Sequence, residues 1–193
     1  MDLLAHAEAL QAEGVRVLAD LDLETAFPTF GPPQLVGSVL SGLITYRDLD
    51  VTFTAPGATA SEVLRGLATI ATRPGLLAAD FRDERADRRP TPAITDERFY
   101  AVLTHHTWKI DLTFWLHDVP RPHVAEATRL RTATPEQKLA VLHLKQTHPA
   151  YPHTISGTTI YTAVLNHNIR TNTQLTEYLH LRSTSAAGRT SDR

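Results

Sequence analysis

Short stretches in which apolar and polar residues alternate run through the first two thirds of the chain, and they predict a β-sheet. Residues 48–54 read DLDVTFT, so three apolar side chains face one way and two aspartates and two threonines face the other. The runs 98–104 and 107–116, with His105-His106 between them, predict a β-hairpin, and the second run alternates in the same way. A further short strand is expected over 34–36.

Apolar residues at helical spacing predict the remaining elements. Thr59 with Glu62, and Thr134 with Gln137, form capping-box patterns, so a helix is expected to begin after each threonine. The first of these helices should stop at Arg73-Pro74-Gly75 and the second at about residue 147. Further helices are expected over 2–20, with a break at Gly14, and over 39–44, 157–168 and 173–181.

Two segments follow neither periodicity. Residues 81–92 (FRDERADRRPTP) mix both charge signs with two prolines, which predicts an exposed loop. Residues 183–193 are small and polar, which predicts a disordered tail. We therefore expect an α+β fold with a mixed β-sheet and flanking helices over 1–120, a C-terminal helical part over 121–182, and the tail.

Composition and charge narrow the class of protein. At 193 residues, 42% hydrophobic and 21% charged, the chain is expected to be soluble and globular. Its 19 basic and 21 acidic residues give a net charge of −2, which argues against nucleic acid as a partner. The absence of cysteine excludes disulfides and zinc–thiolate sites. With an acidic start and no apolar run of about 18 to 20 residues, we expect a cytoplasmic protein without a membrane span.

Three aspartates are the candidates for chemistry. Asp48 and Asp50 lie two apart in one predicted strand, and Asp111 lies on the polar face of another. If these strands are neighbours, the three carboxylates converge, and two ionised carboxylates about 4 Å apart repel by roughly 4 kcal/mol at an effective dielectric near 20. Such a cluster takes up protons or holds a cation, and Mg²⁺, or Mn²⁺ in its place, suits hard oxygen ligands. In isolation, the first two acids would equally suit a solvated strand face.

A glycine-serine turn and two basic residues accompany these acids. Gly37 lets the backbone approach a phosphate closely, and Ser38 offers a hydroxyl at the start of a helix, although a serine there is also an ordinary helix N-cap. Arg47 and Lys109 flank the acids, where they could neutralise a triphosphate or act as surface ion-pair partners. Lys138 and Lys145 leave the same two alternatives open, phosphate contact or solvated helix lysine.

The segment GSVLSGLITYRDLDVTF resembles the Gly-Ser, nine-residue spacer and Asp-x-Asp signature of the DNA polymerase beta-like nucleotidyltransferase superfamily, and KIDLTF resembles its third-carboxylate strand. The resemblance covers roughly residues 15–118. It implies that Gly37 and Ser38 hold a nucleoside triphosphate, that Asp48 and Asp50 bind two magnesium ions, and that Asp111 binds metal or acts as the base. It also implies a nucleotidyltransferase-like sheet, with a helical appendage as in the small antibiotic nucleotidyltransferases.

The expected function is magnesium-dependent transfer of a nucleoside monophosphate from a nucleoside triphosphate to a hydroxyl, with release of pyrophosphate. The acidic balance favours a small molecule or a protein side chain as acceptor over nucleic acid. The alternatives are a catalytically inactive nucleotidyltransferase-like module, for example one half of a two-component pair, that binds nucleotide or protein, and a plain α+β interaction domain. A distance of more than about 8 Å from Asp111 to both other acids would favour the last, because one metal cluster cannot span it.

Overall fold

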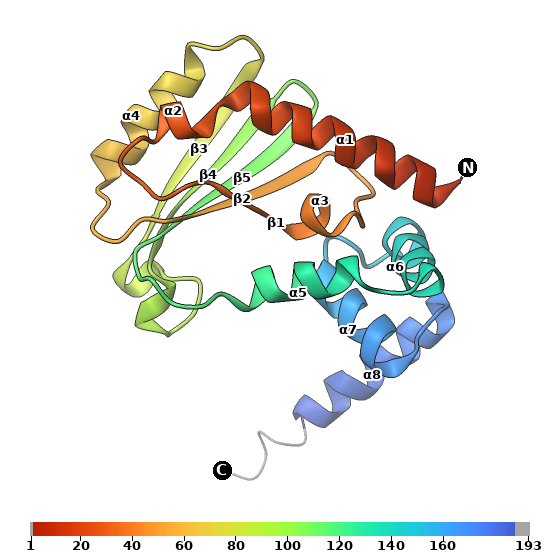
Figure 1. Cartoon of the computed structure of the whole chain (residues 1–193). Coiled ribbons are helices and arrows are strands. Elements are labelled where there is room, and N and C mark those ends of the chain that lie inside the picture. The colour runs from red at the N-terminus through yellow and green to blue at the C-terminus, as the bar shows by residue number, and fades with distance from the viewer. Residues whose placement is uncertain (1, 188–193) are drawn as a thin grey trace. The chain divides into compact units, whose positions relative to one another are not determined.

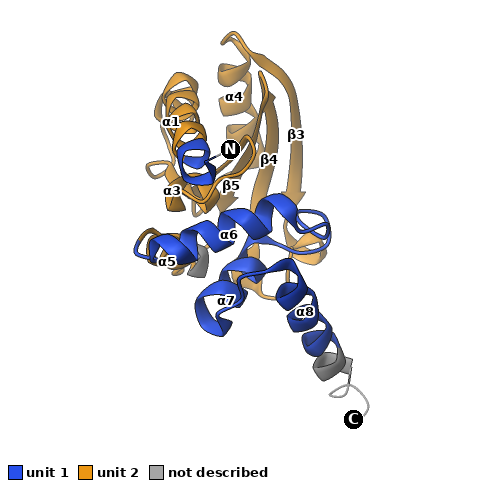
Figure 2. Ribbon diagram, turned by 90° about the vertical axis from the view of Figure 1, so that its right-hand side faces the viewer, with its two compact units in different colours: residues 1–7, 132–193 blue, residues 8–131 orange. Residues whose placement is uncertain are grey.

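The computed structural model describes residues 2–187 and divides the chain into two compact units (Figure 2). Unit 2, residues 8–131, contains the sheet, and unit 1 comprises residues 1–7 and 132–193. The predicted boundary at residue 120 therefore differs from the observed one, because helix α5 (Pro122–Arg131) belongs with the sheet and contacts helix α3 and strand β1.

The sheet of unit 2 is mixed and five-stranded, as Figure 1 shows, with the strands in the order β1-β2-β5-β4-β3. Strands β2 and β5 run parallel, and every other neighbouring pair is antiparallel. The predicted α+β fold with a mixed sheet and flanking helices is confirmed. The strands are β1 (Gln34–Val36), β2 (Asp48–Thr54), β3 (Leu76–Glu84), β4 (Arg98–His105) and β5 (Trp108–Trp115). The helices of this unit are α1 (Leu3–Leu21, of which residues 3–7 belong to unit 1), α2 (Leu23–Ala26), α3 (Gly37–Ser41), α4 (Ala60–Ala71) and α5, with short 3₁₀ turns at Ala86–Arg88 and Ile94–Asp96.

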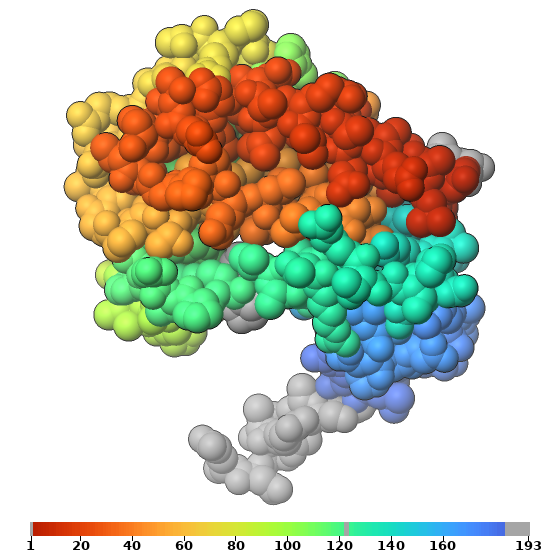
Figure 3. Space-filling model, in the orientation of Figure 1, coloured from red at the N-terminus to blue at the C-terminus, as the bar shows by residue number. Residues whose placement is uncertain are grey.

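One face of the sheet carries the core and the other is polar. The alternating apolar residues of β2 and β5 are almost fully buried (Leu49, Val51 and Phe53 in β2, and Trp108, Ile110, Leu112 and Phe114 in β5). Helices α1 and α4 lie on one side of the sheet (Figure 2), and in the space-filling view the atoms of α1 and of the segment that follows it cover the strands (Figure 3). Because side chains alternate along a strand, the aspartates of β2 and β5 project from the opposite face.

Local signals placed most elements correctly. Both capping boxes are present, so α4 begins after Thr59 and helix α6 (Pro135–Thr147) begins after Thr134. The hairpin of β4 and β5 turns at His106, whose φ of +51° supplies the left-handed residue that Asn or Gly usually provides. Helix α3 begins earlier than expected and ends at Ser41, because Gly42 has a φ of +75°.

The expected break at Gly14 is wrong. Helix α1 runs without interruption through this position. A Cβ on Gly14 would come within 2.9 Å of the Trp108 ring, so the glycine permits close packing of α1 rather than ending it.

The expected loop over 81–92 is also wrong in its first part. Residues 81–84 belong to β3, which pairs with β4 without interruption from Ala78 to Glu84 and has a register shift between Leu76 and Ala78. β3 is the edge strand, and most of its side chains are exposed, so it lacks the apolar alternation that identifies a half-buried strand. Pairing with β4, which is distant in sequence, determined this element.

Unit 1 contains α6, α7 (Gly157–His167) and α8 (Asn172–Ala187), close to the expected ranges. Residues 183–187 of the expected tail lie in α8, and residues 188–193 lie outside the described part of the chain. Lys145 of α6 is only 5% exposed, and its ammonium lies 3.4 Å from the Tyr161 hydroxyl, so it is not a solvated helix lysine. Among the described residues, no helix is both long and apolar enough to cross a membrane.

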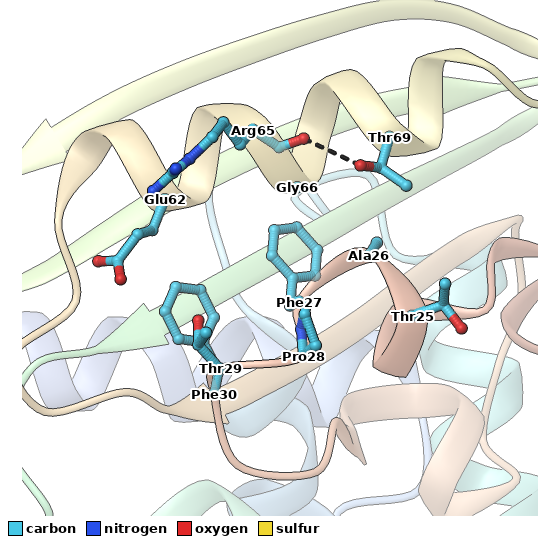
Figure 4. A pocket seen from close by; sticks show the side chains of 10 residues that line it. All are labelled: Thr25, Ala26, Phe27, Pro28, Thr29, Phe30, Glu62, Arg65, Gly66 and Thr69. Atoms are coloured by element: carbon cyan, nitrogen blue, oxygen red, sulfur yellow. Dashed lines mark hydrogen bonds between the residues drawn. The ribbon is translucent and has the colours of Figure 1, made fainter.

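A cavity of about 310 Å³ lies between α4 and the segment that connects α2 to β1. Figure 4 shows the rings of Phe27 and Phe30 on one side of it and α4 on the other. Gly66 of α4 forms part of its wall, because a Cβ there would overlap the Phe27 ring and come within 2.8 Å of the Ala26 carbonyl oxygen. Since α4 packs on the apolar face, this cavity is separate from the aspartates on the polar face.

We expect Gly66→Ala to destabilise the protein, although alanine is the better helix former by about 1 kcal/mol. The added methyl group overlaps the Phe27 ring, and overpacking of this kind costs about 1–3 kcal/mol. Thermal unfolding followed by circular dichroism should show a lower Tm. Adding Phe27→Leu should make the combined loss smaller than the sum of the two single losses, whereas a raised Tm in the single variant would contradict the packing argument.

Candidate active site

The polar face of the sheet brings together the acidic residues selected from the sequence. β2 and β5 lie side by side, with Asp50 directly opposite Asp111. Asp48, two residues earlier in β2, projects from the same face and lies opposite Lys109. The strand pairing on which the convergence of the three carboxylates depended is therefore present. Three carboxylates therefore share one face, and the plain interaction domain with scattered acids is not what the fold shows.

Lys109 bridges two of these carboxylates. Its Nζ donates to Asp111 Oδ2 at 2.7 Å and to Asp48 Oδ1 at 3.2 Å. Because one nitrogen contacts both oxygens, the separation of the two oxygens cannot exceed the sum of these two distances. Both carboxylates are largely buried, whereas half of the Lys109 side chain is exposed. Partial burial alone would lower the pKa of Lys109, but the hydrogen bond to Asp111 and the two negative charges outweigh it and raise the pKa above its usual value. Lys109 thus brings a positive charge into contact with two of the three carboxylates.

Tyr100 is a neighbour of Asp111 that the sequence did not single out. It lies on the polar side of β4, and burial first, then the adjacent Asp111 carboxylate, raise the pKa of its phenol. Asp111 Oδ1, the carboxylate oxygen that does not contact Lys109, is buried and has no hydrogen-bond partner among the described residues. Only the register of β4 on β5 reveals this neighbour, because it places Tyr100 beside the pair formed by Val102 and Asp111.

The glycine-serine turn lies against the middle carboxylate. Gly37 directly follows β1, whose last residue pairs with Asp50, and it has a φ of +65°. A Cβ on Gly37 would overlap Asp50 Oδ2 and come within 2.9 Å of Cγ, so only glycine fits here. Ser38 is not the helix N-cap: Val36 occupies that position, without a side-chain cap. The capping role that was the alternative for Ser38 is therefore not used.

Arg47 takes part in a different contact. Its guanidinium makes two hydrogen bonds to the Glu13 carboxylate of α1, at 2.8 and 3.0 Å, and Trp108 Nε1 donates to the same carboxylate at 2.8 Å. The hydrogen bond to Glu13 raises the pKa of Arg47. Of the two basic residues expected to bind nucleotide, the fold thus brings Lys109 to the carboxylates and pairs Arg47 with α1.

The donor set fits a hard divalent cation. In the described part of the chain, no three Asp, Glu or His side chains are arranged to hold a metal ion as they stand. The ammonium of Lys109, however, already places a positive charge between Asp48 and Asp111, and the buried Oδ1 of Asp111 has no partner. Carboxylate oxygens are the ligands that Mg²⁺ and Mn²⁺ prefer, so these residues could hold one once Lys109 withdraws.

Solved structures similar to this chain are nucleotidyltransferases. A cytoplasmic RNA terminal U-transferase matches with a TM-score of 0.55 and 17% identity, over 86% of this chain and 52% of that chain. Cid1 poly(U) polymerase matches in its MgGTP-bound form with a TM-score of 0.60 and 18% identity (84% and 51% coverage), and in a further crystal structure with 0.55 and 18% (87% and 55%). The chain spans about half the length of these proteins. No protein-family model matches the sequence, and no curated protein is similar to it.

The fold of these matched structures agrees with the fold that was expected from the sequence. The low identities limit the likeness to the fold, but this fold is the one that the glycine-serine and Asp-x-Asp pattern suggested. The resemblance to the DNA polymerase beta-like nucleotidyltransferase superfamily is thereby confirmed at the level of the fold: the chain has the fold of the Cid1-type nucleotidyltransferases.

Proposed function

We propose that the chain transfers a nucleoside monophosphate from a nucleoside triphosphate to a hydroxyl group, with release of pyrophosphate. The observation that carries this proposal is the shared sheet face of Asp48, Asp50 and Asp111, with Asp50 lying against Gly37. Three carboxylates beside a glycine turn suit a cation and a phosphate chain together. The nucleotidyltransferase fold of the neighbouring structures, some of which hold Mg²⁺ with a nucleotide, supports the same chemistry.

Asp48, Asp50 and Asp111 would hold the divalent ions, which, when bound, stabilise the charge on the attacking and leaving oxygens. Gly37 would let the backbone approach the triphosphate, and Ser38 would donate its hydroxyl to it. In the reaction, the acceptor oxygen forms a bond to the α-phosphorus as the bond to the pyrophosphate oxygen breaks. The proton of the acceptor hydroxyl passes to Asp111, whose buried Oδ1 has no hydrogen-bond partner among the described residues.

Lys109 would change partners during this cycle. Its ammonium is held by Asp48 and Asp111, so a cation bound there would release it. Half of the side chain is exposed and its stem is flexible, so the released charge can turn towards the triphosphate and offset the charge of the departing pyrophosphate. We therefore propose that Lys109 binds the nucleotide. Arg47 would do so only after its ion pair with Glu13 has broken.

The acceptor is the part of the proposal on which the observations diverge. The net charge of −2 favours a small molecule or a protein side chain over nucleic acid. The neighbouring proteins are named as an RNA terminal U-transferase and a poly(U) polymerase, and one was solved with the short product ApU. We therefore include an RNA 3′-hydroxyl as an acceptor beside the two expected ones, and the neighbours favour it.

A screen of labelled nucleoside triphosphates tests the proposal. The full chain is incubated with each triphosphate, in Mg²⁺ or in EDTA, and with an RNA oligonucleotide, a small-molecule extract or a protein extract. We expect pyrophosphate release that depends on Mg²⁺ and label on one of the three acceptors. Binding of Mg²⁺-nucleotide in calorimetry without pyrophosphate release would instead support the inactive binding module, which the ammonium between Asp48 and Asp111 favours. If the chain neither binds Mg²⁺-nucleotide nor releases pyrophosphate, both the enzyme and the inactive binding module are refuted.

Removing the ammonium should expose the repulsion between the carboxylates. We expect Lys109→Met to lower the free energy of unfolding by about 1 kcal/mol in EDTA, or a Tm fall of about 2–4 °C, because Asp48 and Asp111 lose their shared partner. In Mg²⁺ the variant should gain more stability than the wild type, since no ammonium has to be displaced. Thermal unfolding in both buffers measures this. Arg65→Met, on the exposed side of α4, is the control, and an equal response of both variants to Mg²⁺ would contradict the idea.

A further inference from the structure

The outer edge of β3 has no strand partner among the described residues of unit 2. β3 ends the strand order, so its only strand neighbour within the described residues is β4 (Figure 2). The strand is nine residues long, and residues 77–80 are all exposed, with Leu77 at 71%. A strand edge of this length presents a row of backbone donors and acceptors to another chain.

The register of the neighbouring hairpin shows which backbone groups point outward. The turn of β4 and β5 has two residues and closes on His105 opposite Trp108, and such a closing pair exchanges both backbone hydrogen bonds. Hydrogen bonding alternates along a strand, so Val102, three residues earlier, directs its N–H and C=O away from β5 and towards β3. There it lies opposite Asp80, whose backbone groups consequently face β4.

The residues of β3 that alternate with Asp80, namely Ala79, Phe81 and Asp83, must therefore direct their backbone N–H and C=O groups away from β4. One contact supports this independently: Arg88 Nε donates to the Asp83 carbonyl oxygen at 2.7 Å, so this carbonyl points away from β4. A carbonyl accepts two hydrogen bonds, so the Arg88 contact leaves room for another donor. These outward groups define the registers in which a second strand can pair.

Among the three registers centred on Asp80, Phe81 and Arg82, charge favours one when the second strand is β3 of another copy. In an antiparallel pair related by a two-fold axis, an axis at Asp80 places this carboxylate opposite its own copy, and an axis at Arg82 does the same with the guanidinium. Like charges directly opposite one another are destabilising. An axis at Phe81 places Asp80 opposite the partner's Arg82 on both sides of the axis. These are the non-hydrogen-bonded positions, where opposing side chains are closest.

We propose that two copies of the chain associate through the outer edges of β3, antiparallel and with the two-fold axis at Phe81, so that the two sheets form one continuous sheet. Asp80 and Arg82 are ion-paired within one chain at 2.7 Å, and both side chains are 54% exposed. In the dimer these residues and their two copies form a four-charge cluster across the axis. The interface is isologous, as a closed dimer requires.

Charge reversal with rescue tests the dimer. Sedimentation of the full chain across a dilution series should show a species of twice the 21.3 kDa monomer mass. Asp80→Arg or Arg82→Asp alone places like charges opposite each other twice, and should weaken the dimer at least about tenfold. The double variant Asp80→Arg/Arg82→Asp restores opposite charges and should recover the dimer. A wild type that stays monomeric, or a dimer that neither reversal weakens, would overturn the proposal, with circular dichroism verifying that each variant is folded.

Cysteine pairs test the register, because the chain has no cysteine of its own. A mixture of the Asp80→Cys and Arg82→Cys variants should form a mixed disulfide-linked dimer under mild oxidation, since these positions face each other across the Phe81 axis. A mixture of Ala78→Cys and Arg82→Cys is the matched control, because those positions face each other only when the axis lies at Asp80. Cross-linking of the control mixture in preference to the first would refute the proposed register.

Discussion

Asp48→Asn combined with Asp50→Asn is expected to lower nucleotide transfer by at least about a thousandfold while the protein remains folded. Losing one group that stabilises developing charge costs about 10²–10³ in rate, and this variant loses two. The fold should survive because asparagine has the same shape and both side chains lie on the polar face of β2, away from the buried residues of that strand. Pyrophosphate release measures the activity, and the Tm and the circular dichroism spectrum measure the fold.

The control for this variant changes two aspartates of unit 2 outside the site. Asp20→Asn combined with Asp87→Asn removes the same charge from two exposed positions, one in α1 and one in the turn after β3. We expect its activity to equal that of the wild type. Full activity in the Asp48/Asp50 variant would refute the assignment of these carboxylates, whatever the control shows.

Gly37→Ala should cause the second-largest loss. A left-handed φ costs a residue with a Cβ about 1–2 kcal/mol, and at this position the Cβ also overlaps the Asp50 carboxylate. Asp50 must therefore move, and a displacement of about 1 Å at a catalytic group can lower the rate about a hundredfold. We expect a Tm several degrees lower and a transfer rate at least about a hundredfold lower.

Gly57→Ala separates the two causes. Gly57 has a φ of +79°, but nothing lies within 4 Å of a Cβ built there, so its variant pays only the cost of backbone conformation. It should lose less stability than the Gly37→Ala variant and none of the activity. Equal activities of the Gly37→Ala and Gly57→Ala variants would show that the contact with Asp50 is unimportant.

Elements whose signals are local were predictable from the sequence. The capping boxes at Thr59 and Thr134 act within one helical turn, and both helices begin where they should. The alternation of β2 and β5 assigned the buried and polar faces of both strands correctly, because side-chain direction reverses at each residue. The same local rules identified the three aspartates and the glycine-serine turn as candidates.

Elements that depend on a distant partner were not predictable. β3 has exposed side chains and exists because β4 pairs with it, so its sequence looks like a charged loop. Gly14 lies in the middle of a helix because Trp108, far along the chain, needs the space. Arg47 and Lys109 looked equivalent in sequence, but one pairs with Glu13 of α1 and the other with the carboxylates.

By itself, therefore, the order of residues determined which side chains could carry chemistry and which face of each strand they occupy, since both follow from local periodicity. The tertiary structure decided that β2 and β5 are parallel neighbours, and so that Asp50 meets Asp111 although 60 residues separate them in the chain. It also decided which cation, that of Lys109, lies between the carboxylates. Pairing of strands far apart in sequence depends on how the whole sheet buries its apolar face, which no short stretch of sequence contains.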